Sequence, residues 1–251
     1  MPFKLSVITV SYNAEQSIAE TFLSVRNQAN KDFEYIVVDG GSNDNTCELI
    51  KQNEDIIGQW ITEPDQGIAD AMNKGAALAQ GDYLLFLHAD DRFAEGNSSN
   101  RAIESTNANT DIVAFEILFK SGQSLRKSQF RGFNFYANFK IPFYHPGVLC
   151  KRDFFNALGG FDPQFKIAMD YDFLLRAHRE KASSLYVREV LTIFQDTGIS
   201  SKRDQISLSK RLDEEKKLHY KNCHSQALFV LYRIWWFIYP LYRKLKSTES
   251  A

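Results

Sequence analysis

Cysteine is scarce in this sequence, and the chain carries almost no net charge. The 251 residues include three cysteines, Cys47, Cys150 and Cys223, which lie far apart and form no C-x-x-C pair. That spacing fits neither a disulfide framework nor a zinc cage, so a reducing cytoplasm is the expected location. Thirty basic and 31 acidic residues nearly cancel. No overall field attracts a nucleic acid, and no nucleic-acid partner is predicted.

Long hydrophobic runs are also missing. The N-terminus, MPFKLSVITVSYN, has a short apolar stretch and no small-residue cleavage site, so it predicts a first strand rather than a secretory signal. The most apolar segment, 227–242, is interrupted by Arg233 and Pro240. Because a membrane span needs about 20 largely apolar residues, we expect no transmembrane helix there.

Two common nucleotide-binding signatures are absent as well. No G-x-G-x-x-G follows the first predicted strand, and the chain has no Walker A sequence. An NAD-type site and a P-loop ATPase are therefore unsupported. Since there is no linker, repeat or low-complexity tract, we predict one continuous domain over residues 1–200, followed by a helical extension over 201–251.

What the N-terminal part does have is an alternation of strand-like and helix-like segments. With 44% hydrophobic and 14% aromatic residues, the chain can bury a substantial core. The predicted strands are 5–10, 35–38, 56–61 and 83–87, and the predicted helices are 18–27, 46–52 and 68–79. This order predicts an α/β fold with a Rossmann-like, mostly parallel sheet flanked by helices, and ligands at the carboxyl ends of the strands.

The remainder of the sequence is less regular. DIVAFEILFK, SLRKSQF and SSLYVREVLTIFQ predict strands, HPGVLCKRDFFNALGGFD a strand, a short helix and a glycine turn, and DYDFLLRAHRE a helix. A charged helix is expected over 204–220. In the tail, ALFVLYRIWWFIYPLYRKLK, aromatic and basic residues are mixed as in helices that lie in a membrane interface. The equally weighted alternative is a helix packed on the core.

Two adjacent carboxylates follow the apolar run LLFL. Asp90 and Asp91 at a strand end would repel each other unless a cation or a proton offsets them. With oxygen ligands and no His or Cys cluster in view, hard Mg²⁺ or Mn²⁺ is favoured over Zn²⁺, and such ions usually bind substrate phosphates too. An Asp-Asp pair alone is more often an acidic turn, so a diphosphate substrate is only one of two interpretations.

Asp39 strengthens the ligand interpretation. It ends the second predicted strand and precedes Gly40 and Gly41, where a carboxylate can accept hydrogen bonds from ribose or a base and glycines leave room for close approach. The same segment, DGGSNDNT, also fits a simple turn followed by an N-capped helix. Both interpretations are compatible.

Four segments, in this order, resemble the family-2 nucleotide-sugar glycosyltransferases, which are inverting enzymes with the GT-A fold. They are VITVSYNAEQSIAETFLSV, YIVVDGGSNDNT, EPDQGIADAMNKGAALAQGDYLLFLHADD and GGFDPQFKIAMDYDFLLR. The resemblance covers about residues 3–200 and points to bacterial surface-polysaccharide enzymes. It implies a hexosyltransferase-like enzyme with a nucleotide-diphosphate sugar as donor and Mg²⁺ or Mn²⁺ as cofactor.

The resemblance also implies roles for particular residues. Asp91 would bind the metal, and Asp170 would be the catalytic base that deprotonates the acceptor hydroxyl. The residues implied in nucleotide-sugar binding are Thr9, Ser11, Tyr12, Asn13, Asp39, Asp65, Gly67, Asp70, Asn73, Lys74, Ala89 and Asp90.

Asp170 has a simpler interpretation and an unusual neighbour. At the start of an apolar helix, a carboxylate often only caps the helix or offsets its dipole. Many relatives carry Glu-Asp where this chain has Met169-Asp170, so one acceptor contact of the family is missing here. His88, beside the acidic pair, and His145, in HPGVL, are candidates for the same cleft, although lone histidines are more often structural.

Three functional hypotheses follow. The first is transfer of a single sugar with inversion, because the Q-x-x-R-W sequence and the membrane spans typical of processive relatives are absent. Acceptors of similar enzymes are often lipid-linked glycans, so we expect a peripheral contact with the inner face of the plasma membrane through the tail. The second is a catalytically silent module that binds nucleotide-sugar or glycan. The third, a sugar nucleotidyltransferase, lacks its usual glycine-rich basic loop, since VSYNAEQS takes that place.

Overall fold

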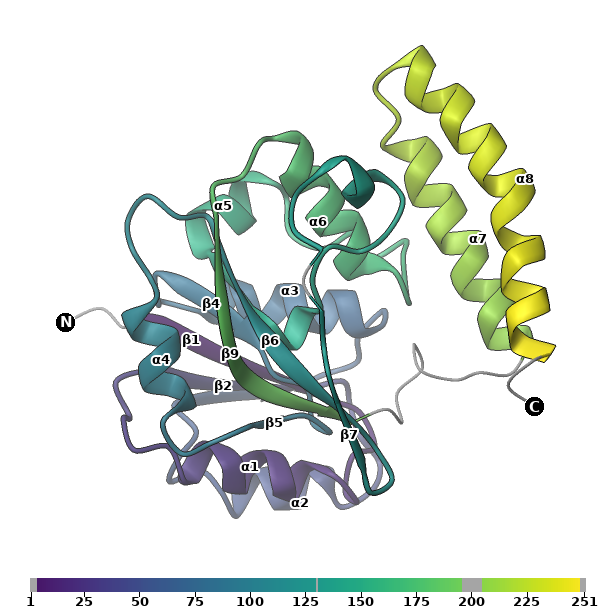
Figure 1. The fold of residues 1–251 in the computed structure, drawn as a ribbon. Helices are drawn as coiled ribbons and strands as arrows, with labels where there is room; N and C mark the ends of the chain where they lie inside the picture. The colour runs from purple at the N-terminus through teal and green to yellow at the C-terminus, as the bar shows by residue number, and fades with distance from the viewer. Residues whose placement is uncertain (1–3, 130, 196–204, 249–251) are drawn as a thin grey trace.

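A single mixed sheet organises the protein. The computed structural model describes residues 4–129, 131–195 and 205–248. Nine strands form the sheet, in the order β3-β2-β1-β4-β8-β6-β9-β5, and β7 pairs with β6 outside this path (Figure 1).

The first four strands and their helices confirm the predicted α/β alternation. The strands β1 (Leu5–Ser11), β2 (Glu34–Asp39), β3 (Gln59–Thr62) and β4 (Tyr83–Phe86) are all parallel. The helices between them are α1 (Ile18–Arg26), α2 (Thr46–Lys51) and α3 (Ile68–Leu78). One boundary prediction was wrong: β3 begins at Gln59 and not at Ile56. Ile57 is buried in the core before the strand begins, and Gly58 N–H donates to the Tyr35 carbonyl at 2.9 Å.

The second half of the sheet mixes directions. The strands are β5 (Arg92–Phe93), β6 (Ile112–Ser121), β7 (Ser124–Lys127), β8 (Val148–Lys151) and β9 (Ser184–Gln195). Strand β8 runs antiparallel between β4 and β6, whereas β9 runs parallel to β6. Two 3₁₀ turns, η1 (Phe135–Asn138) and η2 (His145–Gly147), precede β8. The antiparallel direction of β8 brings η2 to the carboxyl end of β4.

Helices cover both faces of the sheet and enclose two apolar cores (Figure 1). On one face lie α1, α2 and α4 (Ser98–Glu104), which bury residues such as Phe22, Ile50 and Ile103 against the sheet. On the other lie α3, α5 (Arg152–Ala157) and α6 (Met169–Arg179), which contribute Met72, Phe155 and Leu174. The central strands β1, β2 and β4 are buried on both faces, as a doubly covered sheet requires.

The C-terminal extension is a helical hairpin of α7 (Gln205–Lys221) and α8 (Gln226–Thr248). One face of α8 buries Leu228, Tyr232, Trp236 and Tyr239 in a small core with Phe139. The predicted packing of the tail on the rest of the protein is therefore present on this face. The predicted boundary between residues 200 and 201 lies outside the described residues.

Glu214 connects the hairpin to the start of α6. Its carboxylate accepts hydrogen bonds from the backbone N–H groups of Lys166, Ile167 and Ala168, at 3.1, 2.8 and 2.9 Å. Backbone donors at a helix start have no partner within the helix, and a carboxylate also complements the helix dipole. Glu214 therefore caps α6 from a different helix, two residues before Asp170.

His219 fixes the hairpin internally. Its Nδ1 accepts from Trp236 Nε1 at 3.0 Å, its Nε2 lies 2.8 Å from the Tyr171 hydroxyl, and its ring stacks on Tyr232 at 4.6 Å between centroids. An acceptor at Nδ1 requires the neutral ring with its proton on Nε2. Burial, with added repulsion from Lys140 and Arg179, lowers the pKa of His219 to about 3.

We expect Glu214→Ala to lower the free energy of unfolding by about 1–2 kcal/mol, because three charge-assisted contacts to the α6 N-terminus are lost. Urea unfolding followed by circular dichroism measures this loss. Asp213→Ala is the matched control, since Asp213 is an exposed acid on the same helix. Equal stability of the two variants would contradict the capping role.

We also expect stability to fall below about pH 6 because of His219. The pKa of His219 in the folded protein, about 3, lies below the ordinary value of 6.5. The contribution of the neutral ring to the free energy of unfolding is therefore complete above pH 6.5. It is lost as the pH falls toward 3, because the unfolded chain binds the proton first. The loss is about 1.4 kcal/mol per pH unit in that window. Urea unfolding at pH 7 and pH 5 should show a flatter pH dependence for His219→Phe, although this variant is less stable at pH 7. Exposed His224→Gln should retain the wild-type slope; an unchanged slope in His219→Phe would refute the assignment.

Candidate functional site

The candidate site lies where several strand ends meet. Loops 11–14, 39–46 and 62–67 follow β1, β2 and β3, and the turn 88–91 follows β4. Because these four strands are parallel, their carboxyl ends share one edge of the sheet. The loops predicted to bind a ligand therefore lie together at this edge.

The turn after β4 buries a carboxylate. Asp91 N–H donates to the His88 carbonyl at 3.0 Å, and the Asp91 carbonyl accepts from Thr21 Oγ1 at 2.6 Å, so the turn is held from both sides. The Asp91 side chain has no exposed surface, whereas Asp90 is half-buried. Burial, and next the negative charge of Asp90, raises the pKa of Asp91 well above its usual range. A cation beside Asp91 would remove this penalty.

His145 reaches the same place from η2. Strand β8 pairs antiparallel with β4, with Leu149 opposite Leu85, so the segment before β8 lies next to the residues after β4. Gly147 allows η2 to lie flat on β6, because a Cβ there would come within 2.6 Å of the Phe115 carbonyl oxygen. As a result, the His88 and His145 rings face each other with 4.3 Å between centroids and 32° between planes.

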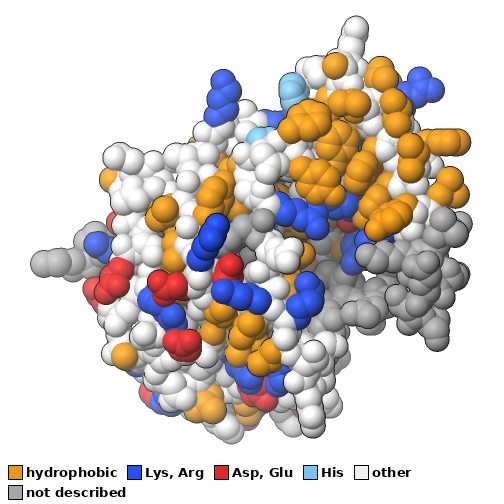
Figure 2. Space-filling model, in the orientation of Figure 1, with side chains coloured by type: hydrophobic (Ala, Val, Ile, Leu, Met, Phe, Trp, Pro, Cys, Tyr) orange, Lys and Arg blue, Asp and Glu red, His pale blue; other side chains and the backbone are white. Residues whose placement is uncertain are grey.

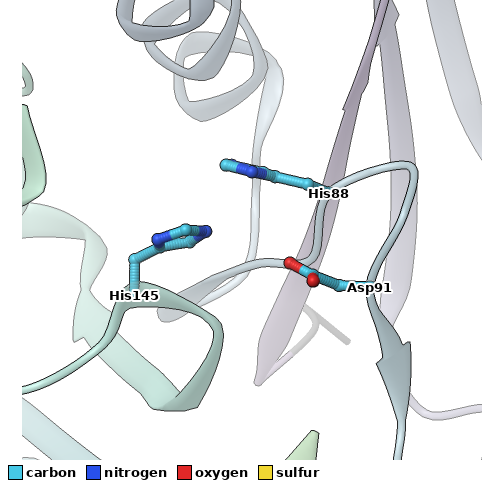
Figure 3. Close-up of side chains that lie close together, drawn as sticks. All are labelled: His88, Asp91 and His145. Carbon is cyan, nitrogen blue, oxygen red and sulfur yellow. The ribbon is translucent and has the colours of Figure 1, made fainter. Parts of the chain in front are cut away.

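His88, Asp91 and His145 form a possible metal-binding group. One ligand atom from each lies within 4.8 Å of the others, and Figure 3 shows the two rings and the carboxylate directed into a common space. Three buried atoms there have no hydrogen-bond partner among the described residues: His88 Nε2, Asp91 Oδ2 and His145 Nε2. These donors fit a divalent cation. The expectation that no histidine cluster accompanies the acidic pair was therefore wrong, because antiparallel pairing brings in a residue distant in sequence.

Asp170 lies beside this group, in the first turn of α6. Its Oδ2 is 3.7 Å from His145 Nδ1, and its Oδ1 accepts from Tyr171 N–H at 2.7 Å. The carboxylate is mostly buried, with 17% of the side chain exposed. Asp172 is turned away and is held by Arg176 and Asn222 at 2.9 and 2.7 Å. Of the two acids in this helix, only Asp170 borders the site.

Both carboxylate oxygens of Asp39 already accept hydrogen bonds from the protein. Its Oδ1 accepts from Ser11 Oγ and Ser42 Oγ, at 3.0 and 2.5 Å, and its Oδ2 from Thr62 Oγ1 and Ser42 N–H, both at 2.8 Å. Burial alone would raise the pKa of Asp39, but the hydrogen bonds from Ser42, Thr62 and Ser11 outweigh it and lower the pKa. The turn interpretation of DGGSNDNT thus describes this conformation well, and a nucleotide would have to share these oxygens.

An exposed aromatic ring and a carboxylate lie over Gly40, the residue after Asp39. Tyr12 is 63% exposed. A Cβ on Gly40 would come within 2.3 Å of Asp65 Oδ2 and 3.4 Å of the Tyr12 ring. Asp65 also accepts from Gly67 N–H at 2.7 Å. The ring and the carboxylate therefore lie over a backbone that carries no side chain, and a nucleobase can stack on such a ring.

Several other predicted binding residues have structural partners. Thr9 is fully buried and its hydroxyl donates to the Leu87 carbonyl at 2.6 Å, so its side chain does not reach the predicted pocket. Asn73 bonds both backbone groups of Phe161, at 2.8 and 2.9 Å, which likewise occupies its amide. Lys74 pairs with Glu63 at 2.7 Å and with Asp70 at 3.5 Å.

The remaining predicted residues stabilise the loops around the site. Asn13 has φ of 49° and accepts from Asn43 N–H at 3.0 Å, which joins the loops after β1 and β2. Ala89 N–H donates to the Val10 carbonyl at 3.3 Å and anchors the turn after β4. Sequence reasoning missed Ser42 and Thr62 as partners of Asp39; only Ser42, three residues after it, left a local turn signal.

Comparisons with known proteins agree with this arrangement. The family model described as Glycosyl transferase family 2 matches residues 6–167. An uncharacterized glycosyltransferase of Mycobacterium tuberculosis is 33% identical over 228 residues, which cover 86% of this chain and 84% of the relative. A PGL/p-HBAD biosynthesis glycosyltransferase of Mycobacterium bovis is 29% identical over 203 residues, covering 77% of each chain.

Solved structures share the fold at low sequence identity. S. aureus TarS 1-349 in complex with UDP-GlcNAc has a TM-score of 0.69 and 18% identity, covering 86% of this chain and 65% of that one. The mannosyltransferase PcManGT from Pyrobaculum calidifontis, in complex with GDP-Man and Mn²⁺, has a TM-score of 0.66 and 16% identity, covering 91% and 69%. This chain spans 39% of the longer TarS structure.

The predicted GT-A fold is confirmed by these neighbours and by the sheet itself. The family model covers well over half of the chain, and a relative with 33% identity is matched over most of its length. The protein is a glycosyltransferase and belongs to glycosyl transferase family 2.

Proposed function

We propose that this protein transfers a single sugar from a nucleotide-diphosphate sugar to an acceptor hydroxyl, with inversion and with a divalent cation. One observation carries the proposal: Asp170, the predicted base, and Asp91, the predicted metal ligand, border the same imidazole. His145 lies 3.7 Å from Asp170 and belongs to the group formed with Asp91. A base beside a cation site suits attack by the acceptor on one side of the anomeric carbon and departure of the diphosphate on the other.

The donor site would lie between Tyr12 and the acidic turn. The exposed Tyr12 ring and the Asp65 carboxylate over Gly40 suit a nucleobase and its N–H groups. Asp90 and Asp91 lie at the neighbouring strand end, where ribose and diphosphate would extend. The bound UDP-GlcNAc and GDP-Man of the two structural neighbours are donors of this kind.

In the proposed reaction the protein positions the donor and the acceptor and accepts one proton. Asp170 would accept the proton of the acceptor hydroxyl as its oxygen bonds to the anomeric carbon and the bond to the nucleoside diphosphate breaks. The α6 N-terminus, held by Glu214, fixes the position of this carboxylate. A divalent cation held by Asp91 would stabilise the negative charge that develops on the leaving diphosphate.

The relatives suggest the biological setting. The M. bovis protein is named for PGL/p-HBAD biosynthesis, and a B. subtilis protein that is 41% identical over 92 residues is named as a putative teichuronic acid biosynthesis glycosyltransferase. Both names refer to bacterial surface molecules. We propose a related role for this chain, in the assembly of a bacterial surface glycan at the cytoplasmic side of the membrane.

One observation favours a silent binding module instead. Met169 is buried in the core and stands where many family members carry a second acid. A chain that had lost catalysis could keep the donor pocket. Because Asp170 itself is retained at the site, we favour the active enzyme.

Asp170→Asn should lower the rate of nucleoside diphosphate release from the active donor by about 10²–10⁴-fold, since a general base contributes about that much. The donor is first identified among UDP-, GDP- and dTDP-sugars by thermal shift with Mn²⁺, because a bound donor stabilises the fold. Donor affinity of the variant should stay within about threefold of wild type, because the base faces the acceptor side.

Asp153→Asn is the matched control, because Asp153 is also a first-turn acid, is exposed and lies in α5. It should release diphosphate at the wild-type rate. Background release by wild type, with intact donor binding, would instead support the silent module.

The outer face of α8 supports the proposal of a membrane contact. Eight large apolar side chains of this helix are exposed, and Phe237 is 77% exposed. Figure 2 shows hydrophobic side chains gathered over this hairpin, with lysines and arginines at the margin. The other seven are Phe229, Val230, Leu231, Ile234, Ile238, Leu241 and Tyr242. A surface helix that is apolar on both faces needs a second apolar environment.

Charge and shape favour a bilayer as that environment. The helix 226–248 contains four basic residues and no acidic ones, which suits anionic headgroups. Beside it, Tyr136 and Phe139 join Trp235 and Tyr239 around an apolar groove of about 590 Å³. No helix in the described part of the chain has the length and apolarity to cross a bilayer. We therefore propose that α8 lies in the interface as a peripheral contact, near a lipid-linked acceptor.

Replacing Ile234 and Phe237 together by glutamine should lower binding to anionic phosphatidylglycerol vesicles by at least about tenfold, since burying two such side chains contributes about 3–6 kcal/mol at most. Vesicle flotation measures the bound fraction. Thermal unfolding should be unchanged, because both side chains are exposed.

Leu125→Gln is the control, because Leu125 is 56% exposed on β7, away from the hairpin. It should float like wild type. If the double variant floats equally well, or if wild type does not float and forms a dimer in light scattering, the membrane proposal fails.

A further inference from the structure

We infer that His88 and His145 are metal ligands together with Asp91, and that this two-nitrogen, one-oxygen set makes the cation site prefer Co²⁺ and similar transition-metal ions over Mg²⁺. The inference rests on the proposed function, because it concerns the cation of the same site. It departs from the oxygen-only site predicted by the acidic pair in the sequence.

The geometry of the three side chains carries the inference. Their potential ligand atoms lie within 4.8 Å of one another, in the described residues, and come from two different segments of the chain (Figure 3). A cation between three such atoms would lie at ordinary bonding distance from each after small side-chain rotations. No backbone rearrangement is needed to bring the ligands together.

The surroundings of His88 and His145 differ from those of a structural histidine. A structural histidine has its ring nitrogens hydrogen-bonded, as His219 does. In contrast, within residues 4–129, 131–195 and 205–248, His88 Nε2, His145 Nε2 and Asp91 Oδ2 are buried without a partner. Three orphaned atoms at one point cost free energy unless something binds all of them.

Donor chemistry then determines which ion fits best. Mg²⁺ prefers six oxygen ligands and dehydrates reluctantly, so two imidazoles are poor ligands for it. Imidazole nitrogen suits later first-row ions, and affinity rises from Mn²⁺ to Co²⁺ along the series. The two rings should therefore contribute strongly to Co²⁺ binding and weakly to Mg²⁺ binding.

His145 would also connect the cation with the base. Its Nε2 faces the metal-binding group, and its Nδ1 lies 3.7 Å from Asp170 Oδ2. Metal-bound histidines usually direct the other ring nitrogen at a carboxylate, which fixes the ring. His145 is thus a positioning residue for Asp170 as well as a ligand.

Isothermal titration of the metal-free protein with CoCl₂ and with MgCl₂ tests the preference. We expect wild type to bind Co²⁺ at least about tenfold more tightly than Mg²⁺. His88→Gln and His145→Gln should each weaken Co²⁺ binding by about 10–100-fold and change Mg²⁺ binding by less than about threefold. Exposed His224→Gln is the control and should change neither. Thermal unfolding without metal verifies that each variant is folded.

A measurement on the wild type alone makes the test independent of folding in the variants. Pulsed electron paramagnetic resonance of bound Mn²⁺ should show coupling to imidazole nitrogen. Absence of this coupling, or equal Co²⁺ affinity in wild type and both folded variants, would overturn the inference. Diphosphate release without nitrogen coupling would leave the proposed function standing and remove this ligand set. Nitrogen coupling without turnover of any donor would support this ligand set and contradict the proposed function.

Discussion

The antiparallel insertion of β8 beside β4 is the constraint on which the site depends. Parallel strands alone bring loops after β1, β2, β3 and β4 to one edge, and those loops supply oxygen donors. A strand that enters in the opposite direction brings the residues before it to that edge. His145 arrives in this way, and the chain beyond β8 then delivers Asp170 at the start of α6. One reversal of direction thus brings the predicted donor-binding edge and the predicted base together.

Burial around Asp91 gives that edge its chemical character. The carboxylate has no exposed surface, and its nearest unpaired neighbours are two imidazoles rather than cationic side chains. Burying a carboxylate without a permanent counter-ion lowers the free energy of unfolding, unless a proton or a bound cation offsets its charge. Asp39 illustrates the alternative, since hydrogen bonds from serine, threonine and backbone donors stabilise its charge. The same sheet edge therefore holds one satisfied carboxylate and one that requires a partner.

The sequence predicts the parallel half of the fold well because the information there is local. Apolar runs, helix periodicity and turn residues each identify one element, and the ends of β1 to β4 were predicted to within one residue, except the start of β3. His88 and His145 were predicted as candidates for one cleft, and the structure places their rings together. Their direct contact could not be predicted, because it depends on the direction of a pairing between distant strands. The binding roles of Thr9 and Asn73 remain predictions. Motif position says which loop a residue belongs to, but only packing shows that its side chain already makes hydrogen bonds within the protein. Long-range pairing and side-chain saturation were the missing information.

The hairpin of α7 and α8 joins the site to the molecular surface. Glu214 on α7 holds the turn that leads into α6. Tyr171, next to Asp170 on α6, contacts His219, which also lies on α7. His219 in turn accepts from Trp236 on α8, whose opposite face exposes Phe237 and its neighbours. Each link is a buried or partly buried hydrogen bond, so displacing α8 would disturb the start of α6. Because these hydrogen bonds link the start of α6 to the hairpin, an acceptor that approached along the apolar face in the proposed reaction would meet Asp170 in an orientation set by the same contacts.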